Sequence, residues 1–192
     1  MGGTVVLLVV LGVLLLLVVL LLRWAIGAYN RLVRLRNQVQ ASWAQIDVQL
    51  TRRHSLIPNL VETVKGYAAH ERGTLEAVVQ ARNTAVNAGG QGPGAQAAAE
   101  GVLTQALGRL FALAEAYPNL KANENFAALQ GELANTEDKI AYARQFYNNA
   151  VQTLNAAVQT IPTNLIAGMG GFRAVQYFEA VGGERGAVNV RF

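Results

Sequence analysis

The 192-residue sequence contains no cysteine, which excludes a disulfide-stapled scaffold. This absence fits a reducing compartment, although many exported domains also lack disulfides. Charged residues are scarce at 15%, and the net charge of +4 comes without a basic face that carries base-reading or stacking groups. The sequence therefore predicts no nucleic-acid partner, and its length allows one domain with a sizeable core.

Motifs for nucleotide binding and nucleophilic catalysis are also missing. Glycines at positions 89, 90, 92 and 94 resemble a phosphate loop in composition only, because no Gly-Lys-Ser/Thr follows them and no strand precedes them. No G-x-S-x-G elbow occurs, and Ser42 and Ser55 have no base and orienting group placed around them. We predict no catalytic residue, no cofactor site and no metal site.

Histidine is rare, with only His54 and His70, both in the stretch RRHSLIPNLVETVKGYAAHE. They lie sixteen positions apart, roughly 24 Å along a continuous helix, so they cannot share one metal ion from that helix. The segment HERGT also lacks the second histidine of a zincin site. We interpret Glu62, Lys65, His70 and Glu71 as a solvated face. A hydrolase using His54, His70 and Glu71 is the rival interpretation.

One long apolar run is present near the N-terminus. Residues 4–22 read TVVLLVVLGVLLLLVVLLL, which as a helix gives roughly 28 Å, about the hydrocarbon thickness of a bilayer. A cleaved signal peptide is the alternative, since the AIG triplet after Trp24 resembles a cleavage site. However, no Lys or Arg precedes the run, and the run is long. We expect a retained transmembrane helix with Arg23, Trp24 and Arg31 at the membrane interface.

Positive charge gathers on one side of this run. Arginines at positions 23, 31, 34 and 36 follow it closely, whereas residues 1–3 carry only the terminal amine. The positive-inside rule then places the rest of the chain in the cytoplasm. The same arginines can meet anionic headgroups, so membrane lipid is an expected partner.

The rest of the chain has the spacing of helices rather than strands. Apolar residues recur three and four apart between positions 32 and 50, so the span should continue into a long amphipathic helix. Pro58 interrupts this stripe, and a kink or a tight corner is expected near residues 55–59. The glycine-rich stretch NAGGQGPGAQ at residues 87–96 predicts a flexible turn where two long helices meet.

The second half of the chain predicts two more long helices. One should run from about residue 96 to residue 116 and stop at Tyr117-Pro118. Asn123 and Asn125 are candidate caps for the next, whose heptad-like seam extends from Phe126 to Ile161 and is closed by Pro162.

Small elements complete the pattern. A small-residue turn is expected at residues 168–171, and a short helical piece at residues 176–180. The sequence thus predicts an all-α fold, in which a single N-terminal transmembrane helix continues into an elongated antiparallel helical bundle with heptad-like seams.

The stretch YPNLKANENF, residues 117–126, is one candidate for partner contact. Its polar side chains either cap the following helix or define a recognition turn at one end of the bundle. The candidate partner-binding residues are Tyr117, Asn119, Asn123 and Asn125.

The closing AVNVRF is the second candidate. Its alternation of Val188, Val190 and Phe192 predicts an extended tail that contacts a groove or a neighbouring subunit. A tail without fixed structure is the alternative.

Three blocks of the sequence together resemble the LemA family of bacterial membrane proteins: ASWAQIDVQLTRRHSLIPNLVETVKGYAAHE, AYPNLKANENFAALQGELANTEDKIAYARQFYNNAVQ and IPTNLIAGMGGFRAVQYFEA. The resemblance implies an all-helical bundle tethered to the bacterial inner membrane, and it does not imply an enzyme. Genes of this family are often found near genes for membrane proteases, which makes such a protease a possible partner. The resemblance supplies no catalytic residues. We assign residues 1–28 to a transmembrane anchor, 29–180 to the LemA-like bundle and 181–192 to an extended tail.

Two functions fit these features. The first is a single-pass membrane scaffold that forms homo-oligomers, because helices of such unequal length cannot easily cover every apolar stripe within one copy. The second is a membrane-tethered adaptor that presents the YPNLKANENF end to a membrane enzyme such as a metalloprotease.

Overall fold

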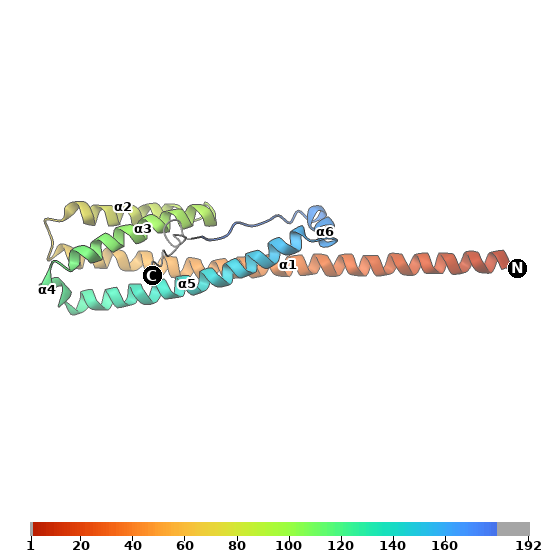
Figure 1. Cartoon of the computed structure of the whole chain (residues 1–192), viewed down its shortest axis with the longest axis horizontal. Helices are drawn as coiled ribbons and strands as arrows, with labels where there is room; N and C mark the ends of the chain where they lie inside the picture. The colour runs from red at the N-terminus through yellow and green to blue at the C-terminus, as the bar shows by residue number, and fades with distance from the viewer. Residues whose placement is uncertain (1, 180–192) are drawn as a thin grey trace, which may run out of the picture. The chain divides into compact units, whose positions relative to one another are not determined.

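The computed structural model of the chain describes residues 2–179. These residues form helices and no strand, which confirms the predicted all-α fold (Figure 1). The helices are α1 (Gly2–Lys65), α2 (Arg72–Asn87), α3 (Pro93–Ala114), α4 (Pro118–Lys121), α5 (Glu124–Gln159) and α6 (Thr163–Met169). The predicted tail contacts Val188, Val190 and Phe192 lie outside the described residues.

The chain divides into two compact units. Unit 1 comprises Met1–Gln40 and Ala150–Val175, and it holds the start of α1, the end of α5 and all of α6. Unit 2 comprises Ala41–Asn149 and Gln176–Phe192, and it holds the remainder of α1 and α5 together with α2, α3 and α4. Two helices are therefore shared between the units, and no separate linker joins them.

Helix α1 continues through Pro58, so the tight corner expected near residues 55–59 is wrong. A proline inside a helix removes one backbone hydrogen bond and crowds the preceding turn. Pro58 is itself exposed, whereas Ile57, Leu60 and Val61 beside it are buried in the core of unit 2. This burial offsets the cost of the proline, and the chain turns only after Lys65, at residues 66–71.

The core of unit 2 lies between α1, α2 and α3. Leu60, Val64, Val78, Leu103 and Leu110 are fully or almost fully buried there. Helices α2 and α3 pack against each other. The predicted glycine-rich turn connects them between Asn87 and Pro93. Gly90 and Gly92 have φ angles of 82° and 103°, a backbone region that favours glycine, so the turn depends on them.

Helix α5 carries the predicted heptad-like seam. Asn123 caps its start, since the Phe126 backbone N–H donates to Asn123 Oδ1 at 3.0 Å, whereas Asn125 lies inside the helix and is exposed. Thr136 is buried within the seam and donates its hydroxyl to Glu132 O at 2.7 Å. The other buried members are Phe126, Leu133, Ile140, Ala143, Tyr147, Ala150, Leu154 and Ala157.

Unit 1 contains a short helix that the sequence does not predict. Helix α5 ends at Gln159, before Ile161, and α6 occupies part of the expected small-residue turn. Gly171, with a φ of 70°, then redirects the chain. Residues 172–179 run as an extended segment, so the helical piece expected from residue 176 is wrong for the described part (Figure 1).

We call residues 172–179 the strap, because side chains of α5 hold this segment by its backbone. In unit 1, Asn155 Nδ2 donates to Val175 O at 2.9 Å, and Val175 N donates to Asn155 Oδ1 at 2.8 Å. In unit 2, Asn148 forms the same pair of bonds with Phe178, at 3.1 and 3.0 Å. These amides satisfy backbone groups that have no neighbouring strand.

Candidate functional site

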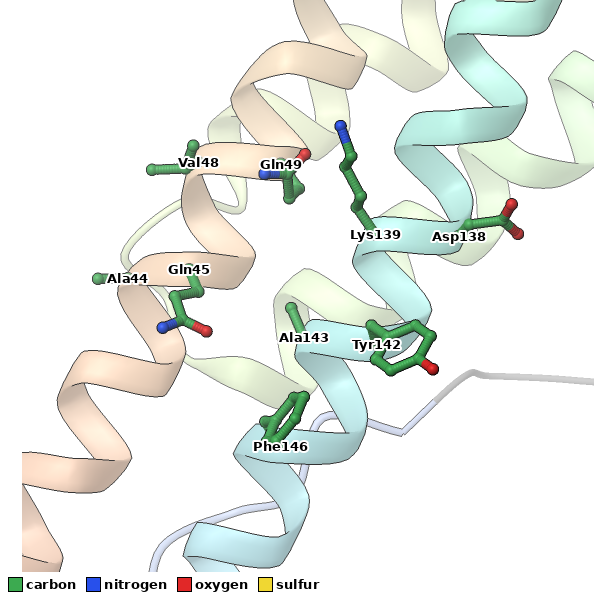
Figure 2. Close-up of a pocket in the computed structure, with 9 residues that line it drawn as sticks. All are labelled: Ala44, Gln45, Val48, Gln49, Asp138, Lys139, Tyr142, Ala143 and Phe146. Atoms are coloured by element: carbon green, nitrogen blue, oxygen red, sulfur yellow. The ribbon is translucent and has the colours of Figure 1, made fainter.

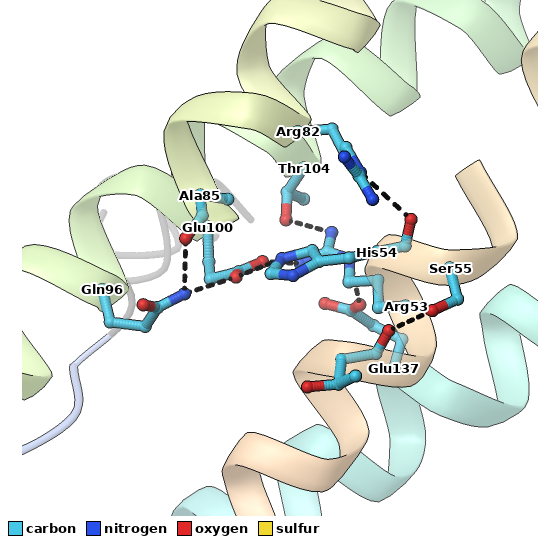
Figure 3. A network of polar contacts seen from close by, with 10 residues as sticks. Arg53, His54, Ser55, Arg82, Ala85, Gln96, Glu100, Thr104 and Glu137 are labelled. Atoms are coloured by element: carbon cyan, nitrogen blue, oxygen red, sulfur yellow. Dashed lines mark hydrogen bonds and ion pairs between the residues drawn. The ribbon is translucent and has the colours of Figure 1, made fainter. Parts of the chain in front are cut away.

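Unit 2 contains a buried polar cluster formed by Arg53 and His54 of α1 and Gln96 and Glu100 of α3 (Figure 3). Each of these residues is at most 8% exposed. Charged side chains are rarely buried to this extent unless they are paired and hydrogen-bonded. The cluster is therefore a candidate for a chemical site.

Glu100 is the centre of the cluster, and its carboxylate accepts hydrogen bonds on both oxygens. Arg53 Nη1 donates to Oε2 at 2.9 Å, and Gln96 Nε2 donates to Oε1 at 2.8 Å. His54 Nε2 lies 2.8 Å from Oε1. Because a carboxylate paired with arginine can only accept, His54 donates here through its Nε2 proton.

The other donors of the cluster are also engaged. Arg53 Nη2 donates to Thr104 Oγ1 at 2.8 Å, and its Nε lies 3.5 Å from a Glu137 oxygen. Gln96 Nε2 donates additionally to Ala85 O at 3.1 Å. Through these contacts the cluster links α1, α2, α3 and α5. We interpret it as a structural lock that fixes the pairing of the helices.

The sequence analysis did not predict this cluster, although its residues stand at positions of the helical repeat that face the core. The apolar stripe of α1 passes from Leu50 to Ile57, and Arg53 and His54 stand at the intervening three- and four-residue steps. Glu100 likewise stands three residues before the buried Leu103. Oppositely charged residues at core positions of two helices could therefore have predicted a buried ion pair.

The rival hydrolase reading finds no support in the geometry. His54 belongs to the buried cluster, whereas His70 is exposed in the turn after α1, and Glu71 accepts a hydrogen bond from Tyr117. Glu62 and Lys65 are exposed, as the solvated-face interpretation requires. Within residues 2–179, no group of three His, Asp or Glu side chains could hold a metal ion.

The YPNLKANENF loop is tied to the turn at residues 66–71. The Tyr117 hydroxyl donates to Glu71 Oε1 at 3.3 Å, and Asn123 Nδ2 donates to the Tyr67 hydroxyl at 3.0 Å. Burial, and then the Glu71 carboxylate, raise the pKa of Tyr117 above its ordinary value. Tyr117 and Asn123 thus have structural roles within unit 2. Asn119 and Asn125 are exposed.

A groove between α1 and α5 lies on the surface of unit 2 (Figure 2). It has a volume of about 580 Å³, and its lining is mainly apolar. Figure 2 shows side chains of both helices on the two sides of this α1–α5 groove. The lining residues are Ala44, Gln45, Val48, Gln49, Asp138, Lys139, Tyr142, Ala143 and Phe146.

Large apolar side chains of the groove are unusually exposed. Tyr142 is 69% exposed and Phe146 59%, and Val48 across from them is 62% exposed. The two rings stack, with centroids 6.4 Å apart, because positions four apart lie on one helix face. Exposed apolar patches of this kind mark interaction surfaces more often than isolated exposed residues do.

The predicted membrane-interface residues all lie in unit 1, on α1. Arg23 and Arg31 are exposed, and Trp24 is 40% exposed. The apolar run that precedes them belongs to a helix long and apolar enough to cross a membrane, and none of its most apolar window is buried. Within the described residues this is the one helix that meets that criterion.

Beyond the apolar run, Phe172 of the strap packs on α1 within unit 1. Its ring meets Tyr29 edge-on at a centroid distance of 5.6 Å, and the Arg36 guanidinium lies 5.1 Å from the ring centroid. Both contacts are attractive, since an aromatic face is electron-rich. The strap residue next to α6 is thereby fixed to a defined part of α1.

The sequence matches the model of the LemA family over residues 42–192. Magnetosome protein MamQ 2 of Paramagnetospirillum magneticum is 30% identical, over 79% of this chain and 64% of its own length. Magnetosome protein MamQ of Magnetospirillum gryphiswaldense is 30% identical, over 78% and 64% respectively. Protein LemA of Metamycoplasma hominis is 26% identical, over 74% and 64%. The chain thus spans 64% of the length of these relatives. Because the family match covers most of its residues, the chain belongs to the LemA family.

Proposed function

We propose that the chain is a non-enzymatic, single-pass membrane protein that associates with copies of itself through the α1–α5 groove. Residues 4–22 of α1 would cross the bacterial inner membrane, and the arginines that follow them favour a cytoplasmic location for unit 2. The observation that carries the proposal is the exposed face of Val48, Tyr142 and Phe146 on long helices.

A second copy is the occupant that this face fits best. Small side chains, Ala44 and Ala143, lie among the large Val48 and Phe146, so the surface presents both projections and hollows. A two-fold interface requires such self-complementarity. Asp138 and Lys139 also line the groove, and a two-fold axis can bring each of them to the opposite charge of the other copy.

The mass of the full chain in nanodiscs or mild detergent tests this proposal. Mass photometry at micromolar concentration should show a defined multimer for the wild type. The variant Y142S/F146S should shift to smaller species, whereas V102S, which changes a 53% exposed valine on α3, should not. Circular dichroism should show equal helix content in all three. A monomeric wild type would overturn the proposal.

The tail residues Val188, Val190 and Phe192 are additional proposed subunit contacts. The same measurement on a chain that ends at Ala180 examines them separately. A multimer that loses mass beyond the removed residues would assign them to the interface, and an unchanged copy number would remove them from it.

A second candidate function, a membrane-tethered adaptor, is favoured by the exposure of Asn119 and Asn125 at one end of unit 2. The proposed partner is a membrane protease. Alanine at Tyr117 or Asn123 would disturb the loop itself, so N119A/N125A is the cleaner variant. An adaptor should lose cross-linking to the protease in this variant while its own multimer persists. Unchanged cross-linking would exclude these two asparagines as the contact.

A further inference from the structure

Helix α6 presents an apolar face that nothing in the described chain covers. Leu165 and Met169 are 64% and 88% exposed. They are spaced four apart, which places them along one side of the helix, while Ala167 faces inward and is buried. Ile161, in the turn just before α6, is 78% exposed. Large apolar side chains exposed together mark an interaction surface more often than isolated ones do.

The position of α6 within unit 1 indicates what that environment is. The Phe172 N–H donates to Ala167 O at 2.9 Å, and the Phe172 ring contacts Tyr29, so α6 is joined to α1 near Tyr29. Tyr29 lies seven residues after the apolar run ends at Leu22, which is about 10 Å along the helix axis. The headgroup region adds roughly 5–8 Å on each side of the hydrocarbon, so α6 lies within reach of the membrane surface.

The charges of unit 1 point to the same partner. Residues 1–40 and 150–175 contain five arginines and no acidic residue. Four of the arginines follow the apolar run on α1, and Arg173 is exposed directly after Phe172. Such a cation-only surface beside an apolar face complements a bilayer that carries anionic headgroups. A protein partner would need an acidic and apolar surface at the same depth.

We propose that the exposed face of α6 inserts into the headgroup boundary of the bilayer, as a second membrane contact beside the transmembrane helix. This proposal rests on the proposed insertion of α1. The face of α6 is continuous with that membrane contact through Tyr29 and Phe172. Two contacts on different elements fix the rotation and tilt of unit 1 in the membrane, which a single span leaves free.

The absence of cysteine allows a direct test by single-site labelling of the full chain. Three variants, L14C, L165C and V102C, are each labelled with an environment-sensitive fluorophore and placed in nanodiscs that contain phosphatidylglycerol. Leu14 reports the span, Leu165 reports α6, and the exposed Val102 of α3 controls for the affinity of the dye for lipid. Nanodiscs with doxyl quenchers near the headgroup or deep in the acyl chain then give the depth of each label.

The label at Leu165 should emit at shorter wavelength than the label at Val102 and be quenched more by the shallow doxyl group than by the deep one. The label at Leu14 should show the reverse depth preference. If Leu14 is quenched and Leu165 behaves like Val102, the α6 proposal is overturned while the membrane anchor stands. A label at Leu165 that is shielded from water but not quenched by lipid also overturns it, because protein then covers the face. An unquenched Leu14 overturns both the anchor and the α6 contact.

Discussion

Unit 1 and unit 2 place their charges in opposite environments. Unit 1 carries five arginines and no acidic residue, and its described residues bury no charged side chain. The rest of the chain holds eleven basic and twelve acidic residues, and within unit 2 a complete ion pair lies in the interior. The net charge of +4 conceals this division. The difference fits the proposed membrane contact of unit 1, whereas the charges in the interior of unit 2 pair its own helices.

The buried cluster illustrates what charge can do inside a helical bundle. Apolar seams alone tolerate sliding of one helix along another, because one leucine can replace the next. Arg53 and Glu100 admit a single register, since any shift would leave both charges unpaired in the core. On this hypothesis the cluster selects one packing of unit 2 and adds little net stability.

The largest predicted effect concerns the buried ion pair of unit 2. Replacing Arg53 with Met leaves the Glu100 carboxylate buried without its partner, so the free energy of unfolding should fall by about 3–5 kcal/mol. In a W24F background, Trp43 is the remaining tryptophan and reports unit 2 during urea unfolding.

The double variant R53M/E100L is the control for that measurement. It removes both charges and should recover part of the loss, because no unpaired charge remains, although His54 Nε2 loses its acceptor. A single variant within 1 kcal/mol of the wild type, or a double variant as unstable as the single one, would contradict the register hypothesis.

The matching test in unit 1 concerns Phe172. Phe172→Ala removes a 93% buried ring, and the free energy of local opening should fall by about 3 kcal/mol. Phe172→Leu keeps most of the burial and loses the contacts with Tyr29 and Arg36, which should cost about 1 kcal/mol. Hydrogen exchange of the residue 172 amide measures both. Equal exchange in the two variants would show that the ring contacts are immaterial, and α3 amides should stay unchanged in either variant.

A smaller effect is expected for the asparagine that binds the strap backbone in each unit, which allows the two units to be compared directly. Asn155→Leu should accelerate hydrogen exchange at the Val175 amide, and Asn148→Leu should do so at the Phe178 amide. Each variant loses two hydrogen bonds, so the local cost should be roughly 1–3 kcal/mol. Each asparagine serves as the control for the other. If both amides respond to either substitution, the strap opens as one segment.

The last effect is confined to alkaline pH. Burial raises the pKa of the Tyr147 hydroxyl from 10.0 to about 12. The folded chain therefore holds this proton more tightly than the unfolded chain, so the associated stability is complete below pH 10 and is lost as the pH rises through about 12.

Tyr147→Phe removes this ionisation. The variant lacks the hydrogen bond to Gln176 O at every pH, but its stability should fall less steeply between pH 10 and about 12 than that of the wild type. Urea unfolding followed by Trp43 fluorescence across this range makes the comparison. Parallel pH profiles would show that Tyr147 is not responsible for the alkaline loss.

The helices were predictable because burial dominates their periodicity. The seam of α5 and the glycine-rich turn follow from apolar spacing and glycine content, and both are observed, although the turn is limited to residues 88–92 of the predicted 87–96. The tight corner at Pro58 was wrong because the sequence shows the proline but not the burial of Ile57 and Leu60 that favours a continuous helix through it.

The candidate surfaces were less predictable, because they depend on which helices become neighbours. Tyr142 and Phe146 look like any members of a broad apolar stripe, and only the packing of α5 shows that they remain exposed. Helix α6 was missed because Gly168 near its end and the glycines that follow it resemble a turn. The Asn123 cap, by contrast, is a local interaction between residues three apart, and the sequence predicts it correctly.

The paired asparagines of α5 have a consequence for cleavage of the chain. Peptidases bind substrates as extended strands through the backbone groups, and the strap has this extended form. At Val175 and at Phe178, however, both the N–H and the C=O are already occupied by an asparagine amide. A peptidase that binds the backbone at these two residues must therefore first displace the asparagine amides, so the amides of Asn148 and Asn155 protect this part of the strap from cleavage.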